Sequence, residues 1–172
     1  MNKYMDIALK EAKKASKKGE VPIGAVIVKN EKIIAKAHNN KEKTKIVTKH
    51  AEIIAIEKAC KKLKTWHLND CELYVTVEPC LMCTGAIIQS RIKKVYFSIE
   101  NEKFGALTKI IKQKNLNIEY EKGLEKEKSI KLMQDFFENK RKWYNKDEVI
   151  WCIKVYIENI DQVLLTKWWD KK

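Results

Sequence analysis

The chain has 172 residues, 45% hydrophobic and 34% charged, which is the balance of one globular domain with a real core. Five glycines and two prolines exclude collagen-like and Pro-rich classes, and no apolar run approaches the ~18 residues of a membrane span. A net charge of +13 favours a polyanionic partner. However, Arg91 and Arg141 are the only arginines, and a lysine excess is also how an AT-rich genome fills surface positions, so charge leaves the partner open.

The first third of the chain predicts a helix, a hairpin and a second helix. Residues 3–17 place apolar side chains on one helical face, and the helix ends near Gly19. Residues 23–28 and 33–37 are strand-like on either side of a polar turn, which is typical of a hairpin. Residues 39–49 are predicted as loop, and residues 50–61 as a mostly buried helix.

The remainder continues the alternation of strands and helices. Strands are predicted at residues 73–77, 94–98 and 116–120, and helices at residues 80–90, 107–112 and 125–143. The helix at 80–90 is apolar all round and is therefore expected to be buried. This order predicts an α/β fold in which helices cover a layered sheet. We expect one domain at residues 1–143 and an extension at 144–172 packed on it, with a strand-like segment at 149–157 and a helical one at 160–169.

The five cysteines do not suggest a disulfide framework, because their number is odd and the N-terminus has no secretory pattern. Cys80 and Cys83 form a Cys-x-x-Cys pair, which alone fits either a metal site or a thiol redox pair. The other three cysteines are most simply small buried hydrophobes.

A metal site becomes the stronger interpretation when His50 and Glu52 are added. Cys80 and Cys83 are expected on the same face of the first helical turn, with Pro79 in that turn, and a helix N-terminus stabilises thiolates. His50, at the start of the preceding helix, supplies a nitrogen ligand. Two sulfurs and one nitrogen leave a fourth tetrahedral position open, as in catalytic zinc sites, where the pKa of bound water falls to about 7.

Glu52 is then the predicted catalytic residue. It lies two residues after the histidine, so its carboxylate can reach the bound water and act as general base and then general acid. A closed structural zinc site would need a fourth ligand. Cys60, Cys71 and His67 have no recognisable ligand spacing.

His50-Ala51-Glu52 followed by Pro79-Cys80-x-x-Cys83 is similar to the signature of the zinc-dependent cytidine/deoxycytidylate deaminase superfamily. Over about residues 3–142 the chain resembles the TadA-type tRNA adenosine deaminases within it. The stretches that carry this resemblance are residues 20–26, 37–39, 50–53, 78–92 and 135–141.

The resemblance implies a three-layer α/β/α cytidine deaminase-like fold, with a central mixed sheet of about five strands and helices on both faces. It implies one Zn²⁺ per chain on His50, Cys80 and Cys83. The implied reaction is hydrolytic deamination of adenosine to inosine in tRNA at the wobble position (34), with Glu52 moving a proton from water to adenine N1 before ammonia departs.

The resemblance also implies substrate contacts. Asn39 contacts the target nucleotide, the Ala51 backbone meets the base edge, and Pro22 and Ile23 line the pocket. If the resemblance is set aside, Asn39 is interpreted as a turn residue that follows a strand. Pro22 and Ile23 are then interpreted as the entry to a strand and part of the core. In the C-terminal helix, aromatic residues beside cations, Phe137 and Arg141 among them, are expected to hold splayed nucleotides.

The implied partners are a tRNA anticodon stem-loop and a second copy of the chain. A heterodimer with a related subunit is the alternative, because residues 101–105 also resemble the catalytic subunit of eukaryotic heterodimeric enzymes. Residues 46–49 depart from the family's Asp-Pro-Thr-Ala-like segment, and Lys49 beside the metal ligand is unexpected. No membrane contact is expected, and the compartment is the cytoplasm, or an organelle if a leader was removed.

Three rival functions remain open. The first is a deaminase of a free base or nucleotide, of guanine or cytosine type, which would share the zinc site. The second is a noncatalytic RNA-binding subunit, which would have no need of Glu52. The third is a thiol redox protein that uses Cys80 and Cys83 without metal.

Overall fold

The computed structural model describes residues 2–114 and 118–141. The chain divides into two units, Met1–Phe136 and Phe137–Lys172, and the sheet described below belongs to the first. The predicted boundary at residue 143 and the predicted segments at 149–157 and 160–169 lie outside the described residues, so this division into domains stays a prediction.

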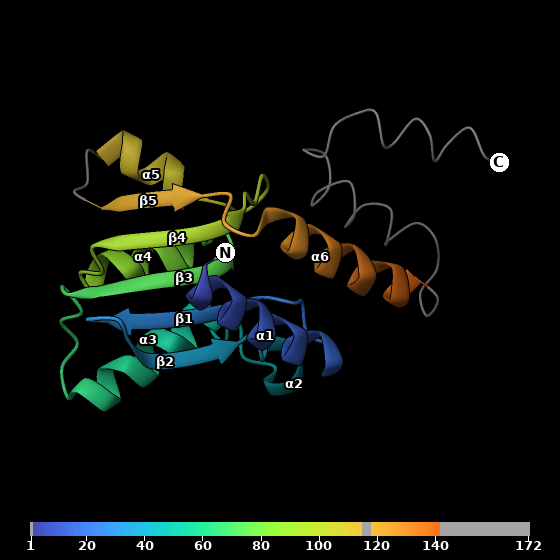
Figure 1. Ribbon diagram of the computed structural model, residues 1–172, viewed down its shortest axis with the longest axis horizontal. Helices are drawn as coiled ribbons and strands as arrows, with labels where there is room; N and C mark the ends of the chain where they lie inside the picture. Colours follow the sequence, from blue (N-terminus) through green and yellow to red (C-terminus); the bar gives the residue numbers. More distant parts are fainter. Residues whose placement is uncertain (1, 115–117, 142–172) are drawn as a thin grey trace. The chain divides into compact units, whose positions relative to one another are not determined.

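Five strands form one mixed sheet in the order β2-β1-β3-β4-β5 (Figure 1). Strand β1 pairs antiparallel with both β2 and β3, whereas β3 pairs parallel with β4 and β4 with β5. The bounds are β1 Gly24–Lys29, β2 Lys32–His38, β3 Cys71–Val77, β4 Lys94–Ile99 and β5 Glu119–Lys122. The predicted mixed sheet of five strands is confirmed.

Helices cover both faces of this sheet (Figure 1). The helices of the described residues are α1 Lys3–Lys17, α2 Lys41–Thr44, α3 Ala51–Leu63, α4 Leu81–Gln89, α5 Leu107–Lys114 and α6 Lys126–Arg141, of which α1, α3, α4 and α5 pack on the sheet. Because side chains alternate along a strand, Val26 and Val28 pack against α1 on one face. Ala25 and Ile27 belong to the larger core on the other face, which α3, α4 and α5 complete. The three-layer α/β/α prediction is therefore confirmed.

Gly24 allows α1 to lie close to the sheet. A Cβ at this position would lie 2.0 Å from the carbonyl oxygen of Ala8 and 2.6 Å from the amide nitrogen of Ala12. Both are backbone atoms of α1 and cannot move aside independently, so only glycine fits this contact between helix and strand.

Helix α4 differs from its prediction, because it is not buried on all sides. Cys83, Thr84 and Ile87 are buried, whereas Leu81 is 67% exposed. An apolar run predicts that a helix is buried, but it does not predict which segments cover each side. The described residues cover the side of α4 that carries Cys83, Thr84 and Ile87. Among the described residues, no segment covers the side of α4 that carries Leu81.

The predicted loop at residues 39–49 contains a short helix, α2, which the sequence analysis missed. Glu20 is buried, and its carboxylate accepts hydrogen bonds from the amides of Glu42 and Lys43 at 3.0 and 2.7 Å. These are amides of the first turn of α2, which have no partner within the helix. A side chain 22 residues away thus stabilises this helical turn, and local sequence patterns carry no signal for it.

Within the described residues, no helix is both long enough and apolar enough to cross a membrane.

Candidate active site

The three predicted metal ligands lie where two helices begin. His50 is the N-cap of α3, and Cys80 is the N-cap of α4, directly after β3. The prediction that Pro79 lies in the first helical turn is wrong, because Pro79 lies two residues before the first helical residue, Leu81. The backbone of Cys80 is extended, with φ −71° and ψ 174°, so the helix begins at Leu81 and Pro79 precedes its cap.

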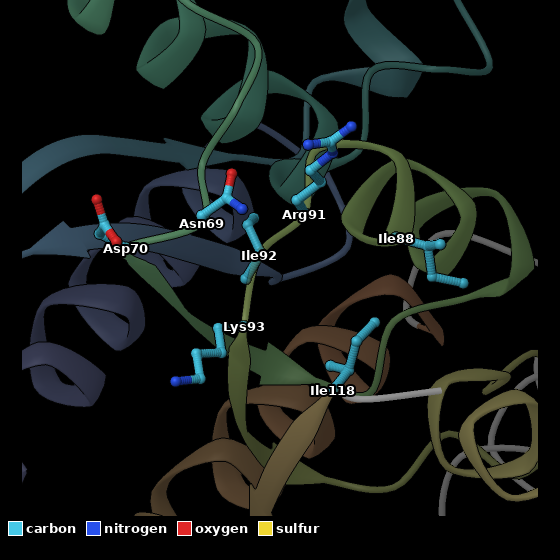
Figure 2. Close-up of a pocket in the computed structure, with 7 residues that line it drawn as sticks. All are labelled: Asn69, Asp70, Ile88, Arg91, Ile92, Lys93 and Ile118. Atoms are coloured by element: carbon cyan, nitrogen blue, oxygen red, sulfur yellow. The ribbon is translucent and has the colours of Figure 1, made fainter. Parts of the chain in front are cut away.

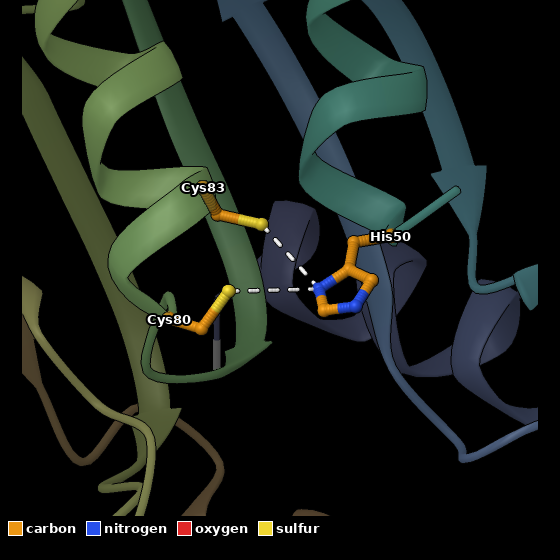
Figure 3. Close-up of side chains that lie close together, drawn as sticks. All are labelled: His50, Cys80 and Cys83. Carbon is orange, nitrogen blue, oxygen red and sulfur yellow. Dashed lines mark hydrogen bonds between the residues drawn. The ribbon is translucent and has the colours of Figure 1, made fainter. Parts of the chain in front are cut away.

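This arrangement brings the three side chains together (Figure 3). His50 Nδ1 lies 3.7 Å from Cys80 Sγ and 3.6 Å from Cys83 Sγ. Cys83 is fully buried, whereas Cys80 and His50 are half-buried. Within the described residues, this group of potential metal ligands consists of these three side chains.

The three side chains fit zinc. Tetrahedral zinc at about 2.3 Å from a sulfur and about 2.0 Å from a nitrogen sets those two atoms about 3.6 Å apart. The observed separations of 3.7 and 3.6 Å match this value. A single ring nitrogen carries at most one hydrogen and cannot donate it to both sulfurs at once, whereas one cation between the three atoms satisfies them all.

Electrostatics favour a thiolate at this site even without metal. The hydrogen bond from the Cys83 side chain, together with His50, lowers the pKa of Cys80 to about 4 against the opposing effect of burial. The same contact with Cys80, and burial, raise the pKa of Cys83. The hydrogen bond to Cys80 also raises the pKa of His50. The N-termini of α3 and α4 add positive partial charge, which suits anionic ligands.

Glu52, in the first turn of α3, is 3% exposed. Burial raises the pKa of this carboxyl, while its own backbone amide and His50 oppose the rise. Its Oε2 atom has no hydrogen-bond partner among the described residues. A buried carboxylate oxygen without a partner is energetically unfavourable, which is typical of a group whose partner is a bound water or substrate.

Three of the predicted substrate residues lie together beside α3. The Oδ1 atom of buried Asn39 accepts a hydrogen bond from the Ala51 amide at 2.9 Å. The Asn39 amide donates to the Ile23 carbonyl at 3.1 Å. These bonds join the start of β1, the end of β2 and the start of α3. Pro22, next to Ile23, is buried.

Phe137 and Arg141 fall in the second unit, Phe137–Lys172, and their role in binding nucleotides stays a prediction.

The sequence analysis missed the role of Glu78, which precedes Pro79 and is 5% exposed. Its Oε2 accepts a hydrogen bond from the Asn101 amide at 3.2 Å. Its Oε1 accepts from the Thr108 amide at 3.1 Å and from the Thr108 hydroxyl at 2.8 Å. Glu78 thereby fixes residues 101–108 beside the metal ligands. The partners of Glu78 lie 23 and 30 residues away, so the sequence carried no signal for this role.

The first unit also contains a pocket of about 470 Å³ (Figure 2). It is lined by Asn69, Asp70, Ile88, Arg91, Ile92, Lys93 and Ile118. Asp70, Lys93 and Ile118 precede β3, β4 and β5, so the pocket lies at the amino ends of these parallel strands. Cys80 follows the carboxyl end of β3, the end at which open α/β sheets bind their ligands. None of the predicted site residues lines this pocket.

Comparison with known proteins gives consistent results. Residues 1–141 match the family model of the MafB19-like deaminases. The chain is 45% identical to the tRNA-specific adenosine deaminase of Bacillus subtilis (strain 168) over 144 residues, covering 81% of this chain and 89% of that protein. It is 52% identical to the enzyme of the same name from Aquifex aeolicus (strain VF5) over 107 residues, covering 62% of this chain and 71% of that protein.

Two solved structures resemble the fold. One comes from a study of A-to-I editing by tRNA:A34 deaminases at the wobble position of transfer RNA. It has a TM-score of 0.71 and 36% identity, and covers 75% of this chain and 97% of that chain. The other is the guanine deaminase of Bacillus subtilis, with a TM-score of 0.57 and 41% identity, covering 61% of this chain and 72% of that chain.

Proposed function

Since the chain matches the MafB19-like deaminase model over residues 1–141 and belongs to the family of tRNA-specific adenosine deaminases, we propose that it hydrolyses adenosine to inosine in tRNA, at wobble position 34. One Zn²⁺ per chain is the cofactor. The observation that carries the proposal is the three-sided cluster of His50, Cys80 and Cys83 beside a buried carboxylate, Glu52.

The chain's own residues account for the proton transfers. His50, Cys80 and Cys83 would hold the zinc ion, which would lower the pKa of a bound water to about 7. Glu52 accepts the proton of the attacking water and delivers it to N1 of adenine, while the water oxygen adds to C6. Glu52 then takes the remaining proton from the oxygen on C6 and passes it to the exocyclic amine, the C6–N bond breaks, and ammonia leaves. One water and one adenosine thus give one inosine and one ammonia. The burial of Glu52 favours this role, because a raised pKa brings a carboxyl closer to the pH at which it must release its proton.

Asn39 and Ala51 orient the target nucleotide in this proposal. The Oδ1 atom of Asn39 is engaged by the Ala51 amide, so the Nδ2 group is the donor that faces the nucleotide. The backbone at Ala51 lies next to both His50 and Glu52, and it meets the base edge. Pro22 and Ile23 form the adjoining wall of the proposed adenosine pocket. The hydrogen bond from the Asn39 amide to the Ile23 carbonyl supports this position.

The proposed substrate is the anticodon stem-loop. An enzyme that acts on a base must take it out of the stack, and an unpaired loop lowers the free energy needed for this step. The net charge of +13 suits the RNA phosphates. Phe137 and Arg141 are proposed as further nucleotide contacts from the C-terminal helix. Residues 1–143 would form the deaminase domain, with 144–172 as its extension, and the bacterial relatives favour the cytoplasm as the compartment.

A homodimer is the proposed assembly, with a heterodimer as the alternative. The open side of α4 supports it: Leu81 is 67% exposed, and a Cβ at Gly85 would have no neighbour within 4 Å. A helix as apolar as α4 is expected to be covered on this side, and a second copy could do so. We expect sedimentation to give a dimer for the wild type and a monomer for Leu81→Lys. A monomeric wild type would contradict the assembly.

The second candidate is a free-base deaminase, because the guanine deaminase of Bacillus subtilis is 41% identical to this chain. The experiment that separates the two offers an anticodon stem-loop with adenosine 34, free guanine and free cytosine to the zinc-loaded protein in parallel. We expect A-to-G reads at position 34 and no ammonia from the free bases. Ammonia from guanine with an unedited stem-loop would establish the alternative.

A further inference from the structure

Large hydrophobic side chains that are exposed are concentrated around the active site. Among the described residues they are Ile46, Val47, Trp66, Leu81 and Phe104. Ile46, Val47 and Leu81 lie within four residues of a proposed metal ligand along the chain. Phe104 directly precedes Gly105, whose backbone pairs with that of Cys80. Trp66 alone lies elsewhere. Apolar surface gathered around a polar site indicates a contact surface for what binds there.

Phe104 is the aromatic residue of this group. Its side chain is 54% exposed, and it directly precedes Gly105, whose backbone forms an isolated β-bridge with Cys80. Bridge partners have Cα atoms up to about 5.5 Å apart and chain neighbours about 3.8 Å, so Phe104 Cα lies within about 9 Å of Cys80 Cα. An exposed aromatic ring therefore lies beside a residue that holds the metal.

The loop that carries Phe104 is held rigidly. The Phe104 amide donates to Asn101 Oδ1 at 3.1 Å, and the Gly105 amide donates to the Asn101 carbonyl at 2.6 Å. A Cβ on Gly105 would lie 2.3 Å from both that carbonyl oxygen and Glu78 Oε2, so no larger residue fits. Asn101 itself is held by Glu78. The ring is thus presented by a preorganised loop, which reduces the entropy lost when a ligand binds.

Trp66 provides the contrast. Its ring packs on His67 with centroids 3.7 Å apart, and the Arg91 guanidinium lies 5.1 Å from its centroid. It follows the C-terminus of α3, a helix of 13 residues whose N-cap is the metal ligand His50, so it is about 20 Å along that helix from the site. Phe104 differs from Trp66 in lying next to the metal ligands.

We infer that Phe104 is the stacking surface for the unpaired nucleobase adjacent to the reacting adenosine, an inference that rests on the proposed function. Bases stack on aromatic side chains without regard to sequence, because every base has a π-face. Lys103 Nζ lies over the Phe104 ring, 5.0 Å from its centroid, and adds a positive charge at this surface, which suits an RNA ligand. This subsite holds the flanking nucleotide while Glu52 acts on the target.

The test measures kcat and KM for an anticodon stem-loop with the zinc-loaded wild type, Phe104→Leu, Phe104→Tyr and the matched control Trp66→Leu. We expect Phe104→Leu to raise KM about 5- to 10-fold with kcat nearly unchanged, Phe104→Tyr to restore KM, and Trp66→Leu to leave KM unchanged. A stem-loop with an abasic neighbour of adenosine 34 should raise the wild-type KM by the same factor and leave Phe104→Leu unaffected.

The outcomes separate this inference from the proposed function. No inosine with wild-type protein would overturn the proposed function. Inosine formation with equal KM for wild type and Phe104→Leu would overturn the stacking inference alone. A Phe104→Leu protein that sediments as a monomer while the wild type is a dimer would also overturn it, since the ring would then contact a second copy of the chain.

Discussion

Asn39 Oδ1 accepts a hydrogen bond from the amide of Ala51 at 2.9 Å, and this contact joins the loop after β2 to the first turn of α3. The same turn carries Glu52, and its cap is His50. One buried side chain therefore helps to set the position of the proposed metal ligand His50 and of the proposed proton carrier Glu52.

Replacing Asn39 should separate its two roles. Asn39→Asp keeps an acceptor for the Ala51 amide, and a helix N-terminus favours the added negative charge, so the fold should persist. It removes the Nδ2 donor, and we expect kcat/KM for the stem-loop to fall about 10-fold or more. Asn39→Ala should also lower the free energy of unfolding by about 1–3 kcal/mol, because the buried amide loses its partner. Urea denaturation and steady-state kinetics measure both, and full activity in Asn39→Asp would remove the proposed donor.

Glu52→Gln should abolish most of the activity without unfolding the protein. Glutamine has nearly the same shape but cannot accept and return a proton, so we expect kcat to fall about 10²- to 10⁴-fold. Zinc content, measured by elemental analysis, should stay at one per chain, and thermal unfolding should be unchanged or slightly higher. Near-normal inosine formation by this variant would rule out Glu52 as the proton carrier.

Glu78→Ala should loosen residues 101–108. It leaves the buried amide of Asn101 and the partly buried amide of Thr108 without their acceptor, at a cost of about 2–4 kcal/mol in unfolding free energy. Thr108→Ser is the matched control, because it keeps the hydroxyl that Glu78 accepts from. Both proteins are compared by chemical denaturation and by hydrogen exchange of the Asn101 amide. Equal exchange in wild type and Glu78→Ala would show that Glu78 does not hold the loop.

Glu11 should make stability depend on pH. Burial alone would raise its pKa, but hydrogen bonds with Lys14 and His38 outweigh this and hold the pKa of Glu11 below its usual value. The unfolded chain then binds a proton more readily than the folded one. This contribution to stability is therefore present above the unfolded pKa of about 4.3 and is lost as pH falls through the lower folded value.

We thus expect Glu11→Gln to lower the free energy of unfolding at pH 7 by about 1–3 kcal/mol, and by much less at pH 3. Urea denaturation at the two pH values checks this. Glu125→Gln serves as a comparison, because Glu125 also forms an ion pair, with Lys128 at 2.7 Å, but its side chain is more exposed than that of Glu11. An equal loss at both pH values would contradict the ion-pair account of Glu11.

The periodicity of the sequence was sufficient for most of the fold, and the motif spacing was sufficient to predict that His50, Cys80 and Cys83 cluster. Apolar residues recur with helical spacing over residues 3–17, and these residues form α1. The signature around His50 and Cys80 predicts a cluster of side chains, which the structure brings together. Patterns failed where the partner is distant in sequence. The apolar pattern of α4 predicted burial on all sides, but Leu81 is exposed. The formation of α2 depends on hydrogen bonds to Glu20. The contacts of Glu78 span 23 and 30 residues, so no local pattern could reveal them.

The central claim is a zinc ion held by two sulfurs and one imidazole, with its fourth position open to water. X-ray absorption at the zinc edge of the purified protein tests it most directly. We predict two sulfur neighbours at about 2.3 Å and two nitrogen or oxygen neighbours at about 2.0–2.1 Å. A shell of three or four sulfurs would identify a closed structural site and contradict the enzymatic account.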